Sequence, residues 1–245
     1  MTANSQIETM VPGNVKLAMK DNGATSSDLW MVPVANLKMI EGFNVRQNTA
    51  EYRAHLTSIT DMILENGFRK DKPLTGYVAN EGGVQSVYIT DGHTRLAGAI
   101  AAIARGASIE ELPVVLVPKG TNKEDLTVGL VVSNTGKPLS PFEVGLVCKR
   151  LVDYGWEEKT IAKRLGFSGK YVNDLLSLLS APKAVRDLVI AGRVSATLAI
   201  EELATNPFMR CHSLELVETL RRVHGLNPIS PVDILSAVRT LKDHF

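Results

Sequence analysis

The stretch Glu158–Leu175, EKTIAKRLGFSGKYVNDL, decides the fold of the second half of the chain. Its apolar residues fall on two helical faces, one on each side of Gly166, and a glycine suits the left-handed backbone of a tight turn. Ala162 is small enough for two helices to approach closely. An ordinary antiparallel helix pair is the alternative, but it does not require Ala and Gly at these two positions. We therefore predict a helix-turn-helix over residues 158–179, a unit that places its second helix in the major groove of DNA.

The second predicted helix runs from Ser168 to about Leu179, and its exposed side chains are expected to face DNA. Asn pairs with adenine, Lys reaches guanine or phosphate, and Tyr donates to phosphate. The first helix carries basic residues that suit backbone phosphates. Asp174 would repel phosphate and fits only beside a cytosine amine or a neighbouring Lys. The candidate DNA-contacting residues are Lys159, Lys163, Arg164, Ser168, Gly169, Lys170, Tyr171, Asn173, Asp174 and Ser177.

Composition and charge narrow the class of protein. The 245 residues are 44% hydrophobic and 22% charged, which is typical of a globular chain with two compact units. The sequence shows neither an apolar run near the roughly 20 residues of a membrane helix nor a secretory signal, so we expect a cytoplasmic protein without membrane contact. Two isolated cysteines make neither a disulfide framework nor a metal site. Residues 149–193 hold nine Lys or Arg against five Asp or Glu, which favours a polyanion partner, although a solvated helix face gives the same surplus.

Residues 30–137 alternate between strand and helix patterns, whereas residues 1–29 have no period and are expected to form a flexible tail. From Ser140 onward every periodic segment is helical, and Ser140–Glu143 is a capping box that starts the first helix. We predict an α+β chain, with a mixed α/β domain over 30–137 and a helical domain over 138–245. The expected elements of the first domain are an edge strand near 31–34, a helix ending at Gly67, a hairpin of 74–79 and 86–89, a helix over 94–105 and a strand over 113–118.

The segment TDGHTRLAGA, residues 90–99, carries a strand into a helix through Gly92. A helix start exposes N–H groups that bind anions, and Gly92 lets a ligand come close. Thr94 adds a hydroxyl, Arg95 adds a fork of donors, and His93 suits a phosphate or a ribose. Asp91 suits a helix cap or a metal ion held through water. A phosphate or nucleotide pocket and a plain turn both account for this segment.

The order of these motifs resembles the ParB family of chromosome and plasmid partition proteins, from about Val32 to Ala204. VPVANL followed by FNVR at 43–46 is similar to the opening strand and the Asn-Pro-Arg-like segment of that family. DGHTRLAGA resembles its Gly-Glu-Arg-Arg box, and SNTGKPLSPFEV resembles its Glu-Asn-x-Gln-Arg box. The Gly-His-Thr-Arg variant is also found in ParB-like proteins of phages and mobile elements, some of them described as nucleases or regulators. The resemblance therefore implies a plasmid, phage or mobile-element member of the family.

The resemblance implies a ParB/sulfiredoxin-like domain that binds a nucleotide, usually CTP with Mg²⁺, coupled to a DNA-binding domain. It also implies double-stranded DNA and a partition ATPase as partners, a homodimer, and a location on the nucleoid or a plasmid. The family's Glu is replaced by His93, so we expect at most weak NTP hydrolysis, and we assign no catalytic residue and no metal ligand. The nucleotide-binding residues implied are Arg46, Gly92, His93, Thr94, Arg95, Asn134 and Lys137.

Three functions remain open on the sequence. The first is a ParB-like DNA-binding protein acting in partition or transcriptional regulation, in which a nucleotide is either a switch or a relic. The second is an enzyme of the same superfamily, a nuclease or phosphotransferase that uses Asp91 and His93. The third is an adaptor that uses its helices for protein contacts. We also predict dimerisation through Ser230–Phe245, whose apolar stripe of Ile234, Leu235, Val238 and Leu241 suits either a second copy or packing within the chain.

Overall fold

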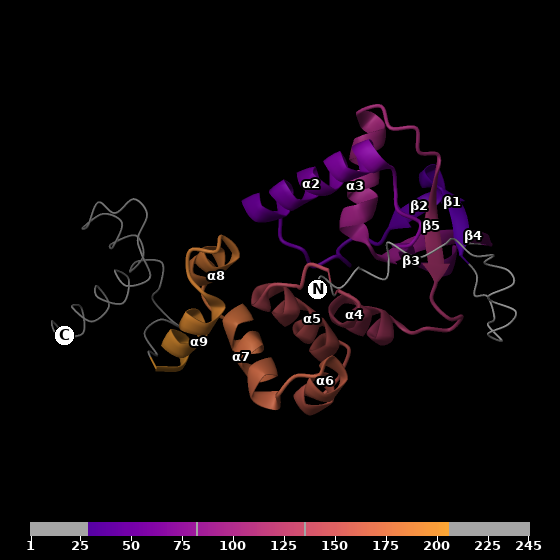
Figure 1. Ribbon diagram of the computed structural model, residues 1–245. Coiled ribbons are helices and arrows are strands. Elements are labelled where there is room, and N and C mark those ends of the chain that lie inside the picture. The colour runs from indigo at the N-terminus through magenta and orange to yellow at the C-terminus, as the bar shows by residue number, and fades with distance from the viewer. Residues whose placement is uncertain (1–28, 82, 135, 206–245) are drawn as a thin grey trace, which may run out of the picture.

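The computed structural model describes residues 29–205 except 82 and 135 (Figure 1). The first half is built on a five-stranded mixed sheet of order β1-β5-β3-β4-β2. β1 pairs with β5 and β3 with β4 in antiparallel fashion, while β2 runs parallel to β4 and β3 parallel to β5. The elements are β1 (Trp30–Pro33), the 3-10 helix η2 (Val34–Asn36), β2 (Leu37–Met39), β3 (Leu74–Glu81), β4 (Val84–Asp91) and β5 (Glu111–Leu116).

The predicted edge strand and the predicted hairpin are confirmed. β1 lies at the edge of the sheet, and β3 and β4 form an antiparallel pair. The turn between them is stabilised where the Gly83 N–H donates to Asn80 Oδ1 at 2.9 Å. The parallel strand β2 was not predicted from the sequence, because three residues are too few to show a period.

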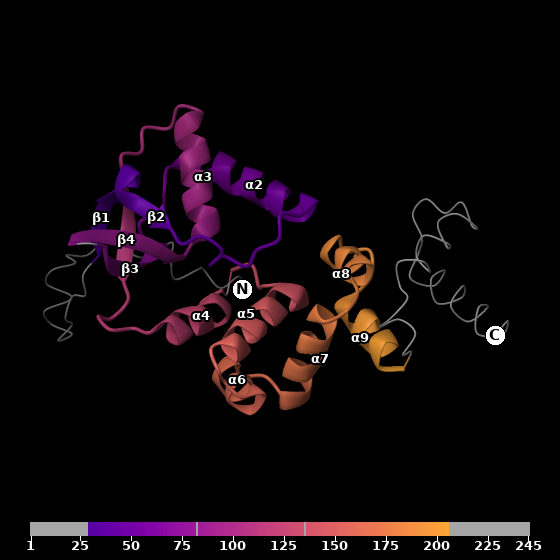
Figure 2. The same cartoon turned by 180° about the vertical axis from the view of Figure 1, so that it is seen from behind.

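Two helices cover one face of the sheet and pack against each other (Figures 1 and 2). They are α2 (Ala50–Asn66), which ends at Gly67 as predicted, and α3 (His93–Ala104). Gly98 of α3 permits their close approach, because a Cβ there would lie 2.8 Å from Ile59 Cγ2. The core beneath them is apolar and fully buried at Leu74, Ile89, Leu112 and Val114.

The second half is helical throughout its described residues, as predicted. The predicted capping box is confirmed, since Ser140 Oγ accepts from the Glu143 N–H at 3.3 Å and Glu143 Oε2 accepts from the Ser140 N–H at 2.8 Å. One further helix, α4, was not predicted. The helices are α4 (Lys123–Val132), α5 (Pro141–Asp153), α6 (Glu158–Leu165), α7 (Gly169–Leu179), α8 (Lys183–Ile190) and α9 (Ala196–Thr205).

The core of the helical half includes residues from the first half of the chain. Phe43 and Val45 are buried in the same cluster as Val128 of α4 and the apolar faces of α5, α6 and α7. Arg150 of α5 fixes this segment, because its Nη1 donates to the Phe43 carbonyl at 2.9 Å and its Nη2 to the Gly42 carbonyl at 2.7 Å. The loop before α2 is therefore packed as part of the helical core.

Several predictions fall on residues that the structure does not describe. They are the N-terminal tail, Cys211 and the proposed dimer helix Ser230–Phe245. Cys148 is a buried core residue of α5, and burial raises its pKa to about 11. Among the helices of residues 29–205, none combines the length and the apolar character needed to cross a membrane.

Candidate functional site

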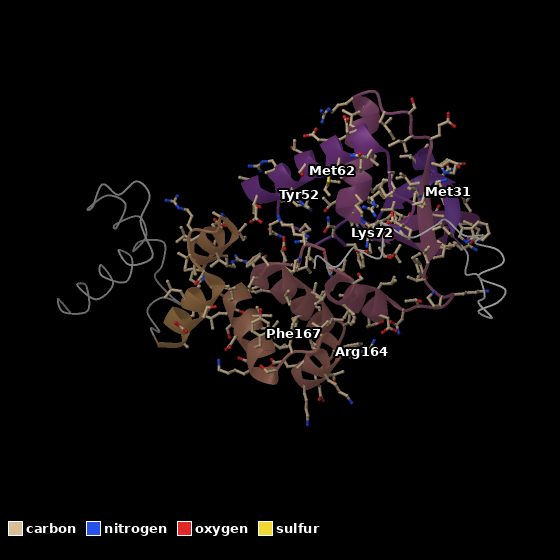
Figure 3. All side chains as sticks on the ribbon, in the orientation of Figure 1. Met31, Tyr52, Met62, Lys72, Arg164 and Phe167 are labelled. Atoms are coloured by element: carbon tan, nitrogen blue, oxygen red, sulfur yellow. The ribbon has the colours of Figure 1, made fainter. Side chains whose placement is uncertain are left out.

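A cavity of about 520 Å³ lies between the sheet-containing half and the connection from α4 to α5. Its walls come from the loop before α2, from α2, from the segment before β3, from the start of α3 and from residues 130–139. Lys72 is at this junction in Figure 3. The cavity brings together all seven residues predicted to bind a nucleotide, which are Arg46, Gly92, His93, Thr94, Arg95, Asn134 and Lys137.

The turn into α3 has the geometry of an anion site. Gly92 is the N-cap residue with φ +88, and no side chain caps this helix start. A Cβ at Gly92 would lie 2.5 Å from Leu74 Cδ2, and the positive φ also disfavours a residue with a side chain. The suggestion that Asp91 caps the helix is wrong, because Asp91 Oδ2 instead lies 3.3 Å from Arg95 Nη2. The first N–H groups of α3 therefore have no side-chain acceptor at the N-cap.

Arg95 holds one wall of the cavity in place. Its Nη1 donates to the Pro73 carbonyl at 2.7 Å and also to the Lys72 carbonyl. Its side chain is 29% exposed and lines the cavity. Arg95 thus fixes the segment before β3 beside the start of α3.

Arg46 links the loop before α2 to the connection between α4 and α5. Its Nη1 donates to the Pro138 carbonyl at 2.9 Å and to Glu143 Oε2 at 3.3 Å, and its Nη2 donates to Asn134 Oδ1 at 2.9 Å and to the Lys137 carbonyl. The side chains of Arg46 and Glu143 are only 10% and 7% exposed. The three predicted residues Arg46, Asn134 and Lys137 are therefore linked by hydrogen bonds. The guanidinium of Arg46 donates its hydrogen bonds to groups of the protein itself.

Lys137 and His55 also line the cavity. Lys137 Nζ lies 2.9 Å from Glu51 Oε1 of α2, and this hydrogen bond lowers the pKa of Glu51. Partial burial, followed by the positive charges of Lys137 and Arg46, lowers the pKa of His55. His55 was not predicted, because nothing in the local sequence of α2 shows that it faces residues some 80 positions away.

His93 is buried at the first position of α3, with 8% of its surface exposed. Its ring centroid lies 6.1 Å from that of Phe43. Burial lowers the pKa of His93, against the opposing effects of the Asp91 charge and a backbone hydrogen bond with Ile89, so the ring is neutral near pH 7. Its Nε2 is buried without a hydrogen-bond partner among the described residues. Within residues 29–205, no group of three or more His, Cys, Asp or Glu has a metal-binding arrangement.

The helix-turn-helix pattern is confirmed by α6 and α7. Gly166 ends α6 in the left-handed conformation with φ +73, and Ala162 is buried where the two helices meet. Ser168 begins α7, and its Oγ accepts from the Tyr171 N–H at 3.1 Å. Val172 is fully buried in the wedge, as the pattern required.

The predicted DNA face is largely exposed, with three exceptions. Tyr171, Asp174 and Ser177 were predicted to be exposed and are half-buried. Tyr171 packs edge to face on Phe167 with ring centroids 5.2 Å apart, and burial raises its pKa. The exposed candidates are Lys159, Lys163, Arg164, Ser168, Gly169, Lys170 and Asn173.

Acidic side chains accompany the basic and polar ones on this face. Lys170 Nζ lies 2.6 Å from Asp174 Oδ2. Lys170 is therefore the neighbouring lysine that we expected beside Asp174. Asn173 Nδ2 donates to Glu158 Oε2 at 3.2 Å. Arg164 forms an ion pair with Asp125 of α4, and its guanidinium lies 5.4 Å from the Trp156 ring centroid (Figure 3).

The geometry of α6 and α7 defines a helix-turn-helix protein, and comparison with known families specifies which kind. Residues 137–205 match the family model of the ParB HTH domain. This part of the chain is therefore similar to the ParB HTH domain. Residues 185–245 match a second model, hydroxyacylglutathione hydrolase C-terminus, mostly outside the described residues. A search of the curated proteins gives no match.

The solved structures that are similar to this chain include three structures of two ParB proteins. C-terminally truncated ParB from Caulobacter crescentus complexed to the centromeric parS site is 17% identical, with a TM-score of 0.49 over 89% of this chain and 100% of that one. The same protein complexed with CTP-gamma-S is 18% identical, with a TM-score of 0.35 over 74% and 94%. The C2221 form of a Pnob8-like ParB-N domain is 13% identical, with a TM-score of 0.39 over 79% and 74%.

Proposed function

We propose that this protein binds double-stranded DNA through α6 and α7 and acts in plasmid or chromosome partition or in transcriptional regulation. The observation that carries the proposal is the ParB-type helix-turn-helix, whose second helix presents Lys170 and Asn173 to solvent. Lys159 and Lys163 extend the basic surface along α6, where backbone phosphates bind. In the cell, this activity would place the protein on the nucleoid or on a plasmid.

The test is selection of bound sequences from random duplex DNA with the full chain, followed by mobility shifts on the selected site. The expected result is an enriched motif that is bound at least 1000-fold, as an order of magnitude, more tightly than random DNA. Failure to enrich any motif would contradict the proposal. Incubation of the selected DNA with Mg²⁺ or Mn²⁺ separates binding from nuclease activity, because a binding protein leaves the duplex uncut.

We propose further that the cavity binds a nucleotide, with CTP and Mg²⁺ as the first candidate. About 520 Å³ is within the usual range for ligand pockets, roughly 300–1,000 Å³. The start of α3, Arg95 and Lys137 would take the phosphates, and Thr94 would add a hydroxyl donor. Asp91 and Asp71 also line the cavity, and Mg²⁺ on nucleotide phosphates accepts one or two carboxylates.

Calorimetry with the four ribonucleoside triphosphates, with and without the selected DNA, tests this site. We expect one triphosphate to bind more tightly than the others and its affinity to change when DNA is present. Absence of binding by all four would leave the Gly92 turn as a structural feature only. Because the family's Glu is His93 here, we expect at most slow hydrolysis of the bound nucleotide.

The oligomeric state and the partners belong to the same proposal. We expect a homodimer, because two-fold symmetric DNA sites match two-fold symmetric proteins, and a partition ATPase as a protein partner. Light scattering on the full chain at tens of micromolar tests the first point. If the chain is a monomer with and without DNA, the dimer is ruled out; if it is a dimer, Leu235→Lys with Val238→Lys should give a folded monomer.

A further inference from the structure

His55 of α2 is a titratable side chain of the cavity without an assigned role. It is half-buried and lines the cavity together with Arg46 and Lys137, which come from two other segments of the chain. It lies one helical turn after Glu51, which holds Lys137 Nζ at 2.9 Å. His55 is thus placed among the cations that would receive an anionic ligand.

The charges around His55 are predominantly positive. The lining of the cavity includes four Lys or Arg side chains against two Asp. Each of the two carboxylates has a basic neighbour, Asp71 with Arg69 and Asp91 with Arg95. Glu51 lies on the same helix as His55, and Lys137 offsets its charge. The basic residues that line the cavity are Arg46, Lys72, Arg95 and Lys137.

We propose that His55 contacts the bound ligand and takes up a proton when an oligophosphate enters the cavity, so that binding strengthens as the pH falls. The proposal rests on the anion site described above and adds the residue that links this site to pH. The chemistry recognised is the phosphate chain, whether it is free or part of a nucleotide. His55 therefore adds a positive charge to the basic residues of the site only while ligand is bound.

The sign of the effect follows from the charges on the two states of the cavity. Without ligand, burial and the charges of Lys137 and Arg46 keep the pKa of His55 below its usual 6.5, and the ring is neutral at pH 7. Several phosphate charges among the same cations favour the imidazolium and raise this pKa. The bound state then holds more protons, so affinity rises as the pH falls through the interval between the two pKa values. Each unit of that interval strengthens binding about tenfold.

The experiment is calorimetry of the full chain with inorganic tripolyphosphate and, in parallel, with CTP. Titrations in buffers of different ionisation enthalpy measure the protons taken up near neutral pH. We expect net uptake, with affinity at about pH 6 about tenfold higher for the parent than for His55→Gln. The phosphate chain itself binds protons at about pH 6, and the proton uptake measured with His55→Gln gives this contribution. His55→Lys carries a permanent charge and should bind more tightly than the parent at about pH 8.

Different failures point to different errors. If tripolyphosphate binds and the proton uptake equals that of His55→Gln, the role of His55 is wrong and the anion site stands. If only CTP gives the uptake, the contact is not with the phosphate chain, and the proposal as stated is overturned. If neither ligand binds at any pH, the nucleotide site itself is wrong. NMR titration of the His55 ring signals measures its pKa directly. A higher pKa in the presence of ligand than in its absence would support the proposal.

Discussion

The helix-turn-helix and the cavity are built in opposite ways from the same chain. Residues 158–179 form the first within one continuous stretch, and its polar side chains are mostly at the surface. The second is assembled from five separate segments, and its Arg46 and Arg95 bond to the backbone that shapes it. The difference teaches that exposed charges on the helix-turn-helix contribute little to stability, whereas the buried cavity charges also hold the fold together.

The largest expected effect tests the structural role of the cavity charges. Arg46→Ala leaves Glu143, which is 6% exposed, without its charged partner. Loss of one partner of a buried pair lowers the free energy of unfolding by about 3–5 kcal/mol, and urea denaturation measures this. The control is Lys183→Ala, which removes an exposed pair with Asp187 and should change stability by less than about 1 kcal/mol. If the two variants lowered stability equally, the cavity charge at Arg46 would contribute no more to the fold than an exposed surface charge.

The next effect concerns the turn at the cavity and a glycine of the helix-turn-helix. Gly92→Ala combines a positive φ with a Cβ 2.5 Å from Leu74 Cδ2, so we expect a loss of about 2–4 kcal/mol in stability. Gly169→Ala is the matched control, because a Cβ there meets no atom within 4 Å. It should leave stability unchanged or raise it by up to about 1 kcal/mol. A stable Gly92→Ala protein would contradict the close packing of this turn.

A smaller effect tests base reading on α7. Lys170→Ala and Asn173→Ala should each weaken binding to the selected DNA site by about 1–3 kcal/mol and leave the unfolding midpoint unchanged. The control is again Lys183→Ala, since Lys183 forms the same kind of ion pair one turn apart, on α8. Mobility shifts on the selected site measure the affinities. Parent-like binding by both variants would show that α7 is not the reading helix.

The smallest effect tests phosphate contacts on α6. Lys159→Ala and Lys163→Ala should weaken binding to selected and random DNA alike, because phosphates carry no sequence information. Each lost contact should reduce the slope of log affinity against log salt by about 1. An effect confined to the selected site would instead assign these lysines to base contacts.

Local rules account for what could be predicted from the sequence. Gly166, Ala162 and the Ser140 capping box each act within a few residues, and the structure has each in its predicted role. Helix α4 was not predicted from the sequence. It nevertheless has an N-cap, because Asn122 Oδ1 accepts from the Asp125 N–H at 2.7 Å. Its apolar residues alternate at Leu126, Val128 and Leu130, which is the period of a strand.

Tertiary packing accounts for what could not be predicted. The sequence marks Arg46 as a candidate ligand for phosphate, but only the fold shows that Glu143, some 97 positions away, holds it. Tyr171 looks exposed on a helical wheel, yet Phe167 in the turn covers it. His55 gains its environment from Lys137 and Arg46, which approach from other segments. Long-range partners of this kind leave no local pattern.

The burial of Phe43 and Val45 within the helical core limits where the chain can be divided into fragments that fold on their own. A fragment that begins at residue 138 lacks these two side chains and Val128, and it would expose an unfilled apolar hollow against α5. Arg150 would also lose the carbonyls of Gly42 and Phe43. A transfer of the helical half to another protein must therefore include a short piece from upstream of α2. The packed unit around the helix-turn-helix is therefore not one continuous stretch of the sequence.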